Sequence, residues 1–235
     1  REDHSTDPEW STYGIENSPV AWEDMLFFVD NGGFVKAIDK DLKEIWTVDN
    51  MDDTDASITL DMENGNPVLY TACEVDKQGS EGFSRILKIE AKTGKILWEK
   101  DYKAYSVGTS NGGALATNIV GKNSMSNMVI FTLSRAEIKD KGLMVALDKA
   151  TGKELWRWQM PTYAWSSPVD VYDSQGKSYI LQTVRSGAMY IIDAADGKIL
   201  GKKDIDSYIE ASPSVYNDYA VIASRNGFIY GLKLR

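Results

Sequence analysis

Short apolar runs that alternate with turn residues extend along most of the chain. Met25–Val29 and Phe34–Asp39 flank the turn residues Asn31-Gly32-Gly33, and a further run follows at 44–48. Runs of this length bounded by such turns predict β-strands joined by hairpins. Connections this short leave no room for crossover helices, so we expect antiparallel meanders.

One eleven-residue pattern occurs four times. Residues 146–156 read Ala-Leu-Asp-Lys-Ala-Thr-Gly-Lys-Glu-Leu-Trp, which predicts a strand, a tight turn on Thr-Gly and a second strand that closes on tryptophan. Residues 88–98 repeat the spacing, 37–46 repeat it one residue shorter, and 191–201 end in Gly201. The closing positions are 52, 58 and 45 residues apart. A period of about 40–60 residues built from short strands is typical of a β-propeller.

The repeats divide the chain into five units. The predicted units are 18–48, 57–100, 114–158, 167–205 and 212–234, and the last is one strand short. Trp10, in segment 9–13, resembles the closing strand of a blade and is predicted to supply that strand. We therefore expect an all-β fold over 1–235, a single β-propeller domain of five four-stranded antiparallel blades closed by the N- and C-terminal strands. The alternative is a fragment of a seven- or eight-bladed ring. The polar residues 1–9 are expected to be frayed.

Two polar insertions occur at the same connection of successive units. Residues 76–82 lie between the second and third strands of the second unit, and 135–141 lie at the matching place in the third. Loops at equivalent connections lie on one face of a propeller, and such a face often binds other molecules.

Composition and charge exclude several classes of partner. The chain has 26 basic and 35 acidic residues, a net charge of −9, which disfavours binding to nucleic acid and to anionic lipid. No apolar run approaches the roughly 20 residues of a transmembrane helix. The first residue of the chain is Arg1 and not Met. We therefore expect a processed or excised product, from which any signal peptide would already be removed.

Residues that commonly carry catalysis or bind metals are scarce. Cys73 is the only cysteine, which excludes an internal disulfide and a Cys-x-x-Cys site, and its apolar run 68–73 predicts burial on a strand. His4 is the only histidine and lies in a polar terminal segment, so neither a Ser-His-Asp triad nor a histidine zinc site is expected. We predict no catalytic residue and no metal ligand, although a glycosidase-like pair of carboxylates stays open.

Two acidic segments share only part of the pattern of a calcium-binding loop. The run 49–55 lacks the glycine and the glutamate of an EF-hand, because Thr54 and Leu60 occupy those positions. We interpret it as a solvated loop between blades. In 61–65 the glycine falls one place early, which favours a hairpin turn.

Aligning the starts of the first strands yields a candidate ligand site. Small hydroxyl residues share one position, and they are Ser18, Ser57, Thr117, Ser167 and Ser212. Two places earlier stand Glu16, Asp55, Leu115, Trp165 and Glu210. Because first strands line a propeller's central channel, we expect Glu16, Asp55, Trp165 and Glu210 at its mouth, where they would bind a cation or a small polar ligand. The alternative is that small hydroxyls fit the crowded axis and the carboxylates face water.

The repeat resembles the tryptophan-docking motif of the PQQ-binding-like, or quinoprotein-like, β-propeller family. That motif reads Ala-x-Asp-x-x-Thr-Gly-Lys-x-x-Trp, and 146–156 match every defined position, whereas Lys88 and Glu90 depart from it in 88–98. The resemblance implies that the closing tryptophans pack between neighbouring blades; these are Trp10, Trp46, Trp98 and Trp156. Gly201 departs from the motif, so we expect a looser contact there.

The resemblance also bears on function. The PQQ-dependent alcohol dehydrogenases of this family hold their cofactor against a vicinal disulfide, with calcium and an aspartate base, and a chain with one cysteine cannot form that disulfide. We therefore expect no cofactor, with calcium left open. The family includes outer-membrane assembly lipoprotein propellers, which implies a non-catalytic, protein-binding scaffold. Such a protein would be extracytoplasmic (periplasmic, cell-surface or secreted) and derived from a lipoprotein or signal-peptide precursor. The alternatives are binding of a small ligand, a sugar or a cation, at the channel mouth and, third, a PQQ-dependent oxidoreductase.

Overall fold

The computed structural model describes residues 14–205 and 207–234. Over these residues it shows four antiparallel sheets of four strands, which follow one another along the chain and are called blades 1 to 4. Blade 1 contains β1 (Val20–Trp22), β2 (Met25–Val29), β3 (Phe34–Asp39) and β4 (Glu44–Asp49). Blade 2 contains β5 (Thr59–Glu63), β6 (Asn66–Ala72), β8 (Glu81–Glu90) and β9 (Ile96–Tyr105). Blade 3 contains β11 (Ile119–Val120), β12 (Met128–Leu133), β13 (Leu143–Asp148) and β14 (Glu154–Gln159). Blade 4 contains β15 (Val169–Tyr172), β16 (Ser178–Val184), β17 (Ala188–Asp193) and β18 (Ile199–Asp204).

The remaining elements are short. Blade 5 has three strands in the described residues, β19 (Ser214–Tyr216), β20 (Tyr219–Ala223) and β21 (Ile229–Lys233). A two-stranded ribbon pairs β7 (Glu74–Val75) with β10 (Gly112–Gly113), and one 3₁₀ turn, η2, covers Asn123–Met125. The predicted all-β fold of four-stranded antiparallel blades is confirmed, whereas the ribbon was not predicted.

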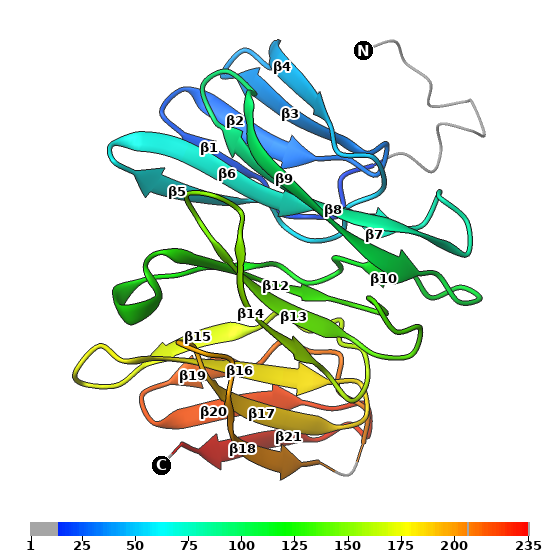
Figure 1. Ribbon diagram of the computed structural model, residues 1–235, viewed down its shortest axis with the longest axis vertical. Helices are drawn as coiled ribbons and strands as arrows, with labels where there is room; N and C mark the ends of the chain where they lie inside the picture. Colours follow the sequence, from blue (N-terminus) through cyan, green and yellow to red (C-terminus); the bar gives the residue numbers. More distant parts are fainter. Residues whose placement is uncertain (1–13, 206, 235) are drawn as a thin grey trace.

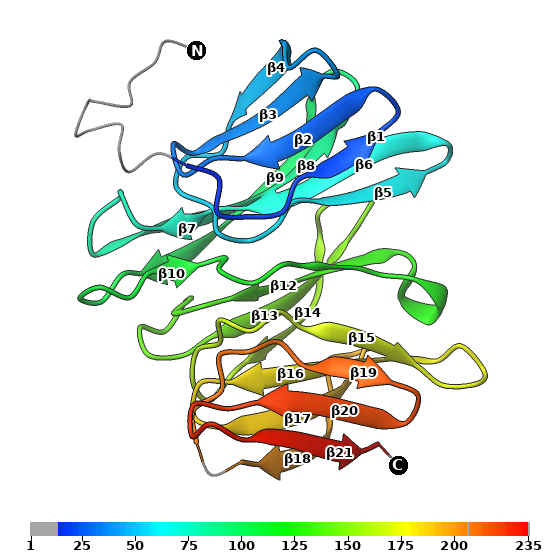
Figure 2. The same cartoon turned by 180° about the vertical axis from the view of Figure 1, so that it is seen from behind.

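Each blade packs against the next one along the chain. Blade 1 lies at one end of the molecule, and blades 4 and 5 overlap at the other end, with blade 4 nearer the viewer in Figure 1 and blade 5 nearer in Figure 2. The described residues therefore form an open stack and not a closed ring. The strand predicted to complete blade 5, with Trp10 in 9–13, lies outside the described residues, as does the segment 1–9. The closed ring and its five blades stay a prediction.

Strand positions agree with the turn chemistry, but one loop was interpreted wrongly. β2 and β3 have the predicted bounds, and 61–65 form the expected hairpin between β5 and β6, with Glu63 paired to Asn66. The run 49–55, expected to be solvated, is largely buried: Asn50 is 0%, Asp52 1% and Thr54 1% exposed. Backbone amides satisfy the Asp52 carboxylate and replace the water that was expected around it.

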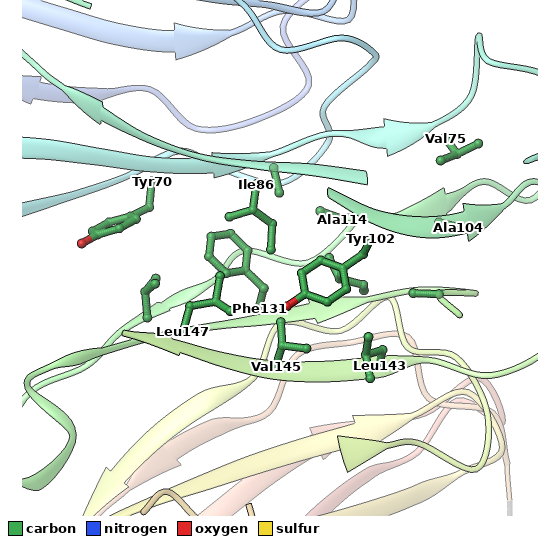
Figure 3. Packing of buried hydrophobic residues seen from close by; sticks show 14 of the residues in the cluster. Tyr70, Val75, Ile86, Tyr102, Ala104, Ala114, Phe131, Leu143, Val145 and Leu147 are labelled. Carbon is green, nitrogen blue, oxygen red and sulfur yellow. The ribbon is translucent and has the colours of Figure 1, made fainter. Parts of the chain in front are cut away.

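Apolar faces of adjacent blades form the core. Between blades 2 and 3, Tyr70 and Ile86 project from one sheet toward Phe131 and Val145 of the next (Figure 3). Tyr102 of β9 closes this layer and is 2% exposed. The middle strands β6, β12 and β16 are almost wholly buried because a blade covers each of their faces.

Tryptophans of the fourth strands connect each of the first three blades to the next. The indole N–H of Trp98, on β9, donates to the carbonyl oxygen of Lys149 at 2.9 Å, in the turn between β13 and β14. Its ring lies against Gly152 of that turn, where a Cβ would come within 2.8 Å of the indole. The same two contacts recur for Trp46 with Ala91 and Gly94, at 2.9 Å, and for Trp156 with Ala194 and Gly197, at 3.0 Å.

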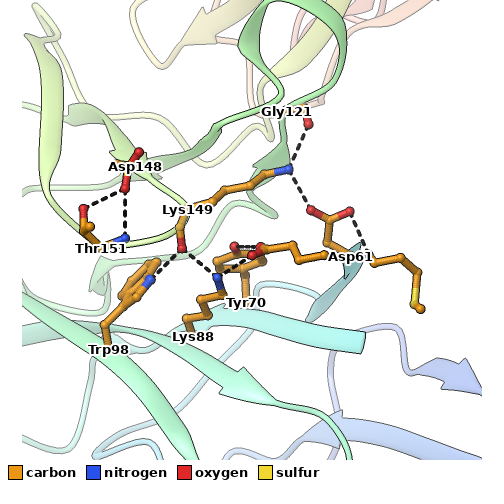
Figure 4. Close-up of polar contacts among 10 residues, drawn as sticks. Asp61, Tyr70, Lys88, Trp98, Gly121, Asp148, Lys149 and Thr151 are labelled. Carbon is orange, nitrogen blue, oxygen red and sulfur yellow. Dashed lines mark hydrogen bonds and ion pairs between the residues drawn. The ribbon is translucent and has the colours of Figure 1, made fainter. Parts of the chain in front are cut away.

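Lys88, one of the motif's departures, adds an ionic contact between blades 2 and 3. It pairs with Trp98 in the sheet, where blades 1 and 3 have Ala37 and Ala146. Its Nζ donates to the carbonyl oxygen of Lys149 at 2.7 Å and pairs with Glu63 at 2.6 Å (Figure 4).

The side chain of Lys149 makes a second ionic contact across the same interface. Its Nζ pairs with Asp61 at 2.7 Å and donates to the carbonyl oxygen of Gly121 at 2.9 Å. The nearly buried ammonium groups of Lys88 and Lys149 are thus each paired with a carboxylate on β5. Such buried pairs fix the relative position of two packed surfaces, because a shift that separates the partners leaves a buried charge without compensation.

Candidate functional site on the mouth face

The aligned hydroxyl residues form a hydrogen-bonded ladder from blade to blade. They lie where each first strand begins and each second strand ends, on the side of Figure 1 where β7 and β10 lie, and we call this side the mouth face. In each step a backbone N–H of one blade donates to the hydroxyl oxygen of the next. The steps are Ser18 to Ser57 (3.0 Å), Ser57 to Thr117 (3.1 Å), Thr117 to Ser167 (3.0 Å) and Ser167 to Ser212 (2.9 Å). These hydroxyls therefore hold the blades together.

A second set of equivalent residues, which the sequence analysis missed, surrounds the ladder. Each follows the second strand of its blade, and its backbone N–H donates to a carbonyl four places before the ladder hydroxyl, as Glu74 does to Asp53 at 2.8 Å. The members of the set are Asn31, Glu74, Ser134, Arg185 and Arg225. The signal that would have found them is the end of each second strand, counted from its hairpin.

The mouth face is acidic at blades 1 and 2. The Glu16 carboxyl hydrogen-bonds Asp55, and this bond, with the charge of Asp55, raises the pKa of Glu16. Glu74 is 0% exposed and accepts from the Asp55 amide at 3.1 Å through Oε1, while its Oε2 has no hydrogen-bond partner. Burial, followed by the charge of Asp55, raises the pKa of Glu74 to about 9. Burial also raises the pKa of Asp53 to about 6. We therefore expect the Glu74 carboxyl group to be protonated at neutral pH.

The mouth face is basic and aromatic at blades 4 and 5. The Arg185 guanidinium lies between two rings, 5.5 Å from the centroid of Trp165 and 4.4 Å from that of Tyr208. It pairs with Glu210 at 2.7 Å, and Arg225 pairs with the other oxygen of that carboxylate at 2.6 Å. Cation–π contacts and shared ion pairs of this kind order long side chains that would otherwise be mobile.

The four predicted mouth residues fall into two separate groups. Glu16 contacts Asp55, and Trp165 and Glu210 both contact Arg185. Within the described residues, no hydrogen bond or ion pair joins one group to the other. Glu210 is neutralised by two arginines, so three free carboxylates do not converge with an indole, as the sequence alone suggested.

The loop 76–82 has a defined conformation because one buried carboxylate holds it. Asp52 accepts from the amides of Asp76 and Lys77, at 3.0 and 3.1 Å, and from Gln78 Nε2 at 3.0 Å. Gln78 in turn bonds both backbone groups of Phe83. Loop and acidic run thus fold as one unit.

The loop 135–141 contacts blade 2 and the segment that joins blade 3 to blade 4. The Glu137 amide donates to the Lys103 carbonyl at 2.8 Å, and Arg135 lies over the ring of Tyr163 at 4.0 Å. Ile138 is the apolar tip of the loop and is 47% exposed. Both insertions lie on the mouth face, as equivalent strand connections require.

PQQ requires a flat apolar slot and cations for its carboxylates, and the mouth face offers neither in the right place. The face of the Trp165 indole is covered by Arg185, whose charge Glu210 already neutralises. Cys73 is buried, and burial raises the pKa of its thiol to about 12. These residues do not fit the cofactor. Among the described residues, no set of three His, Cys, Asp or Glu side chains has a metal-binding arrangement, and no helix is long and apolar enough to cross a membrane.

Family models match two overlapping parts of the chain. The model described as outer membrane protein assembly factor BamB matches residues 140–234. The model described as the β-propeller domain of glucose/ethanol/alcohol dehydrogenase matches residues 78–180. The predicted resemblance to the PQQ-binding-like propeller family is confirmed.

The curated relatives include assembly factors and a dehydrogenase. BamB of Shewanella oneidensis is 22% identical over 214 residues, which are 90% of this chain and 41% of the relative. BamB of Kangiella koreensis is 26% identical over 165 residues, 66% of this chain and 40% of the relative. Quinohemoprotein alcohol dehydrogenase of Comamonas testosteroni is 28% identical over 152 residues, which are 63% of this chain and 20% of the relative. The match thus spans about 40% of the length of the two BamB relatives.

Solved structures share the fold. BamB from Moraxella catarrhalis superposes with a TM-score of 0.63 at 16% identity, over 94% of this chain and 60% of that chain. A europium-containing methanol dehydrogenase superposes with a TM-score of 0.60 at 14% identity, over 82% of this chain and 42% of that chain. At these identities the likeness establishes the β-propeller architecture.

Proposed function

We propose that this chain is a non-catalytic, extracytoplasmic propeller scaffold that binds a protein partner through its mouth face. The observation that carries the proposal is that loops 76–82 and 135–141 are held by specific hydrogen bonds on one face. Pre-ordered loops lose little conformational entropy on binding, which favours their use as recognition surfaces.

Similarity to proteins named as outer membrane assembly factors supports this choice over the enzyme. The alignment to the Shewanella oneidensis relative covers 90% of the chain. The partner would accordingly be a protein of outer-membrane assembly, and the location extracytoplasmic, reached through a lipoprotein or signal-peptide precursor.

The chemistry of the mouth face suits a protein partner. Arg185 lies beside Trp165, Tyr163 and Tyr208, and Arg225 pairs with the same carboxylate as Arg185. Arginine and aromatic residues are enriched at interface centres. Blades 1 and 2 offer the opposite charge, so a partner with a matching charge distribution would bind in one orientation.

Photo-crosslinking in cells of the source organism tests the proposal. A photoreactive amino acid replaces Ile138 in loop 135–141 or, as a matched control, Leu97 at the opposite end of the strands; the two are 47% and 42% exposed. We expect a crosslink to an outer-membrane assembly protein from position 138 and not from 97. Equal crosslinking from both positions, or from neither, would contradict the proposal.

A second candidate function is binding of a small polar ligand or cation at the mouth. It is supported by two polar atoms that lack partners, Glu74 Oε2 and Trp165 Nε1. Thermal melting with calcium, with PQQ and with a panel of sugars tests it, because a ligand that binds only the native state raises the melting temperature. If one of them does so, substitution of Glu16 and Glu210 by Gln should remove the shift. An unchanged shift in that double variant would exclude the predicted site.

A further inference from the structure

A polar hollow opens on the mouth face of blade 2, between the loop 76–82 and the segment that leads from β9 to β10 (Figure 1). Its volume is about 470 Å³, and its lining consists of Asp76, Ser80, Ser106, Thr109, Asn111 and two glycines. Every side chain in this lining is polar. Sites for small apolar molecules have mostly apolar walls, so this hollow favours a polar or charged group.

Backbone hydrogen bonds hold both walls of the hollow in place. The Ser106 N–H donates to the Ser80 carbonyl at 3.1 Å and thereby joins one wall to the other. Val107 and Ser110 exchange hydrogen bonds at 2.9 and 3.1 Å, which close a tight hairpin. The opposite wall, loop 76–82, is held by the buried carboxylate described above. The hollow is therefore formed before any occupant enters.

Four carboxyl groups gather beside the hollow. Asp76 lines it and is exposed, while Asn111 lies beside the Glu74 carboxyl group. Glu74 is 0% exposed, and its Oε2 has no hydrogen-bond partner. After burial, the charges of Asp55 and Asp53 raise the pKa of Glu74. A buried carboxyl oxygen among like charges is stabilised by a cation brought next to it.

The cationic side chain on this loop is directed toward blade 1. Lys77 Nζ donates to the Asn31 carbonyl, and its charge opposes the rise that burial causes in the pKa of Asp53. One ammonium group thus stands against four carboxyl groups. A metal ion does not fit, because no three of these groups among the described residues have a metal-binding arrangement. An organic ammonium group fits, since it is a compact charge with three rotatable donors.

We propose that this hollow, the acidic hollow, receives the ammonium group of a lysine side chain from the protein that binds the mouth face. Asp76 supplies the opposite charge at the opening, and the hydroxyls of Ser80 and Thr109 and the amide oxygen of Asn111 supply acceptors. It rests on the proposed function, because the lysine belongs to that partner. All of these residues lie within blade 2 and its connection to blade 3.

Nuclear magnetic resonance titration of the intact, isotope-labelled chain tests the proposal. The probe is N-acetyl-lysine amide, and N-acetyl-norleucine amide has the same carbon chain without the ammonium group. We expect saturable shifts of the Asp76, Ser80 and Asn111 amide signals with the lysine probe, with a Kd on the order of 1 mM for a ligand of this size. The norleucine probe should give no saturable shift. Absence of saturation by the lysine probe, or equal shifts with both probes, would overturn the assignment.

Carboxyl-to-amide variants locate the site. Asp76→Asn keeps the backbone amide that bonds Asp52 and should weaken lysine-probe binding about twofold to fivefold. Adding Glu74→Gln, which keeps an acceptor for the Asp55 amide, should abolish saturable binding. Asp204→Asn is the matched control, because that side chain is 71% exposed and does not line the hollow, and it should bind as the parent does. Unchanged affinity in the double variant would exclude the acidic hollow.

Photo-crosslinking in cells separates this proposal from the proposed function. The yield of the crosslink from position 138 should fall about fivefold or more in the double variant Asp76→Asn/Glu74→Gln, because the partner loses its lysine contact. An unchanged yield would overturn the lysine contact alone. No crosslink from position 138 in the parent chain would overturn the proposed function and with it the partner's lysine, whereas the titration alone decides whether the hollow binds ammonium.

Discussion

The backbone N–H of Ser57 donates to the hydroxyl oxygen of Thr117 at 3.1 Å, across 60 residues of sequence. This bond is one step of a ladder in which each blade caps the first strand of the one before it. The ladder explains why position after position at the axis carries Ser or Thr. A small side chain fits the crowded axis, and its hydroxyl supplies the acceptor that the neighbouring N–H needs.

Removing the acceptor while keeping the shape of Thr117 should destabilise the protein. Thr117→Val leaves the Ser57 amide without its partner, and we expect a loss of about 1–2 kcal/mol in the free energy of unfolding. Thr117→Ser, which keeps the oxygen, is the control and should lose less than half as much. Urea unfolding followed by circular dichroism measures both. An unchanged free energy of unfolding in Thr117→Val would mean that the hydrogen bond contributes nothing at this position.

Two glycine-to-alanine variants separate the conformational cost of the substitution from the cost of displacing a docked tryptophan. Gly152 has φ +69°, and a Cβ there would lie 2.8 Å from the Trp98 ring, whereas Gly65 has φ +79° with nothing within 4 Å. Gly65→Ala should cost about 1 kcal/mol, the conformational cost alone. Gly152→Ala should cost about 2–4 kcal/mol, because the indole must also move. Thermal unfolding of the two variants side by side measures the difference. A cost at Gly152 no larger than at Gly65 would show that Trp98 is not packed against this turn.

The features that sequence predicted are those that short-range chemistry specifies. The bounds of β2 and β3 follow from the apolar runs and the turn between them. The Thr-Gly turn and the closing tryptophan of residues 146–156 sufficed to identify the repeat, and the period identified the propeller. Aligning the first strands also placed the ladder hydroxyls correctly, since each precedes its strand by a fixed count.

Features that depend on how blades meet were not predictable. The distance from the ladder hydroxyl to the residue after the second strand varies, from 13 residues for Ser18 and Asn31 to 18 for Ser167 and Arg185. Sequence spacing therefore did not reveal that Arg185 would cover Trp165. The acidic run around Asp52 looked solvated because its partners are backbone amides of a loop some 25 residues away.

Lys88 offers a test of the ionic contact between blades 2 and 3. Lys88→Met removes the charge but keeps most of the side-chain volume, and it leaves Glu63, whose side chain is 24% exposed, without its cation. We expect a loss of about 1–3 kcal/mol in the free energy of unfolding. Adding Glu63→Gln should restore part of that loss, since the unpaired charge is then gone. A double-mutant cycle from denaturant unfolding measures the coupling between the two side chains. Strictly additive losses would indicate that the pair contributes nothing to the interface.

Glu74 predicts how stability depends on pH. Its pKa is about 9 in the folded protein, against an ordinary value of 4.5, because it is buried and lies near Asp55. Between these two values the folded state holds a proton that the unfolded state has released, so stability falls as pH rises through this window. Glu74→Gln keeps an acceptor for the Asp55 amide and cannot ionise. The variant should therefore equal the parent below about pH 4.5 and exceed it by about 2 kcal/mol at pH 8, which raises the melting temperature by about 4–8 °C. Melting curves from pH 4 to pH 9 measure this, with Glu99→Gln, at an exposed position on β9, as the control that should follow the parent throughout. A gain at Glu74 that does not grow with pH would mean that the carboxyl group is not protonated in the folded protein.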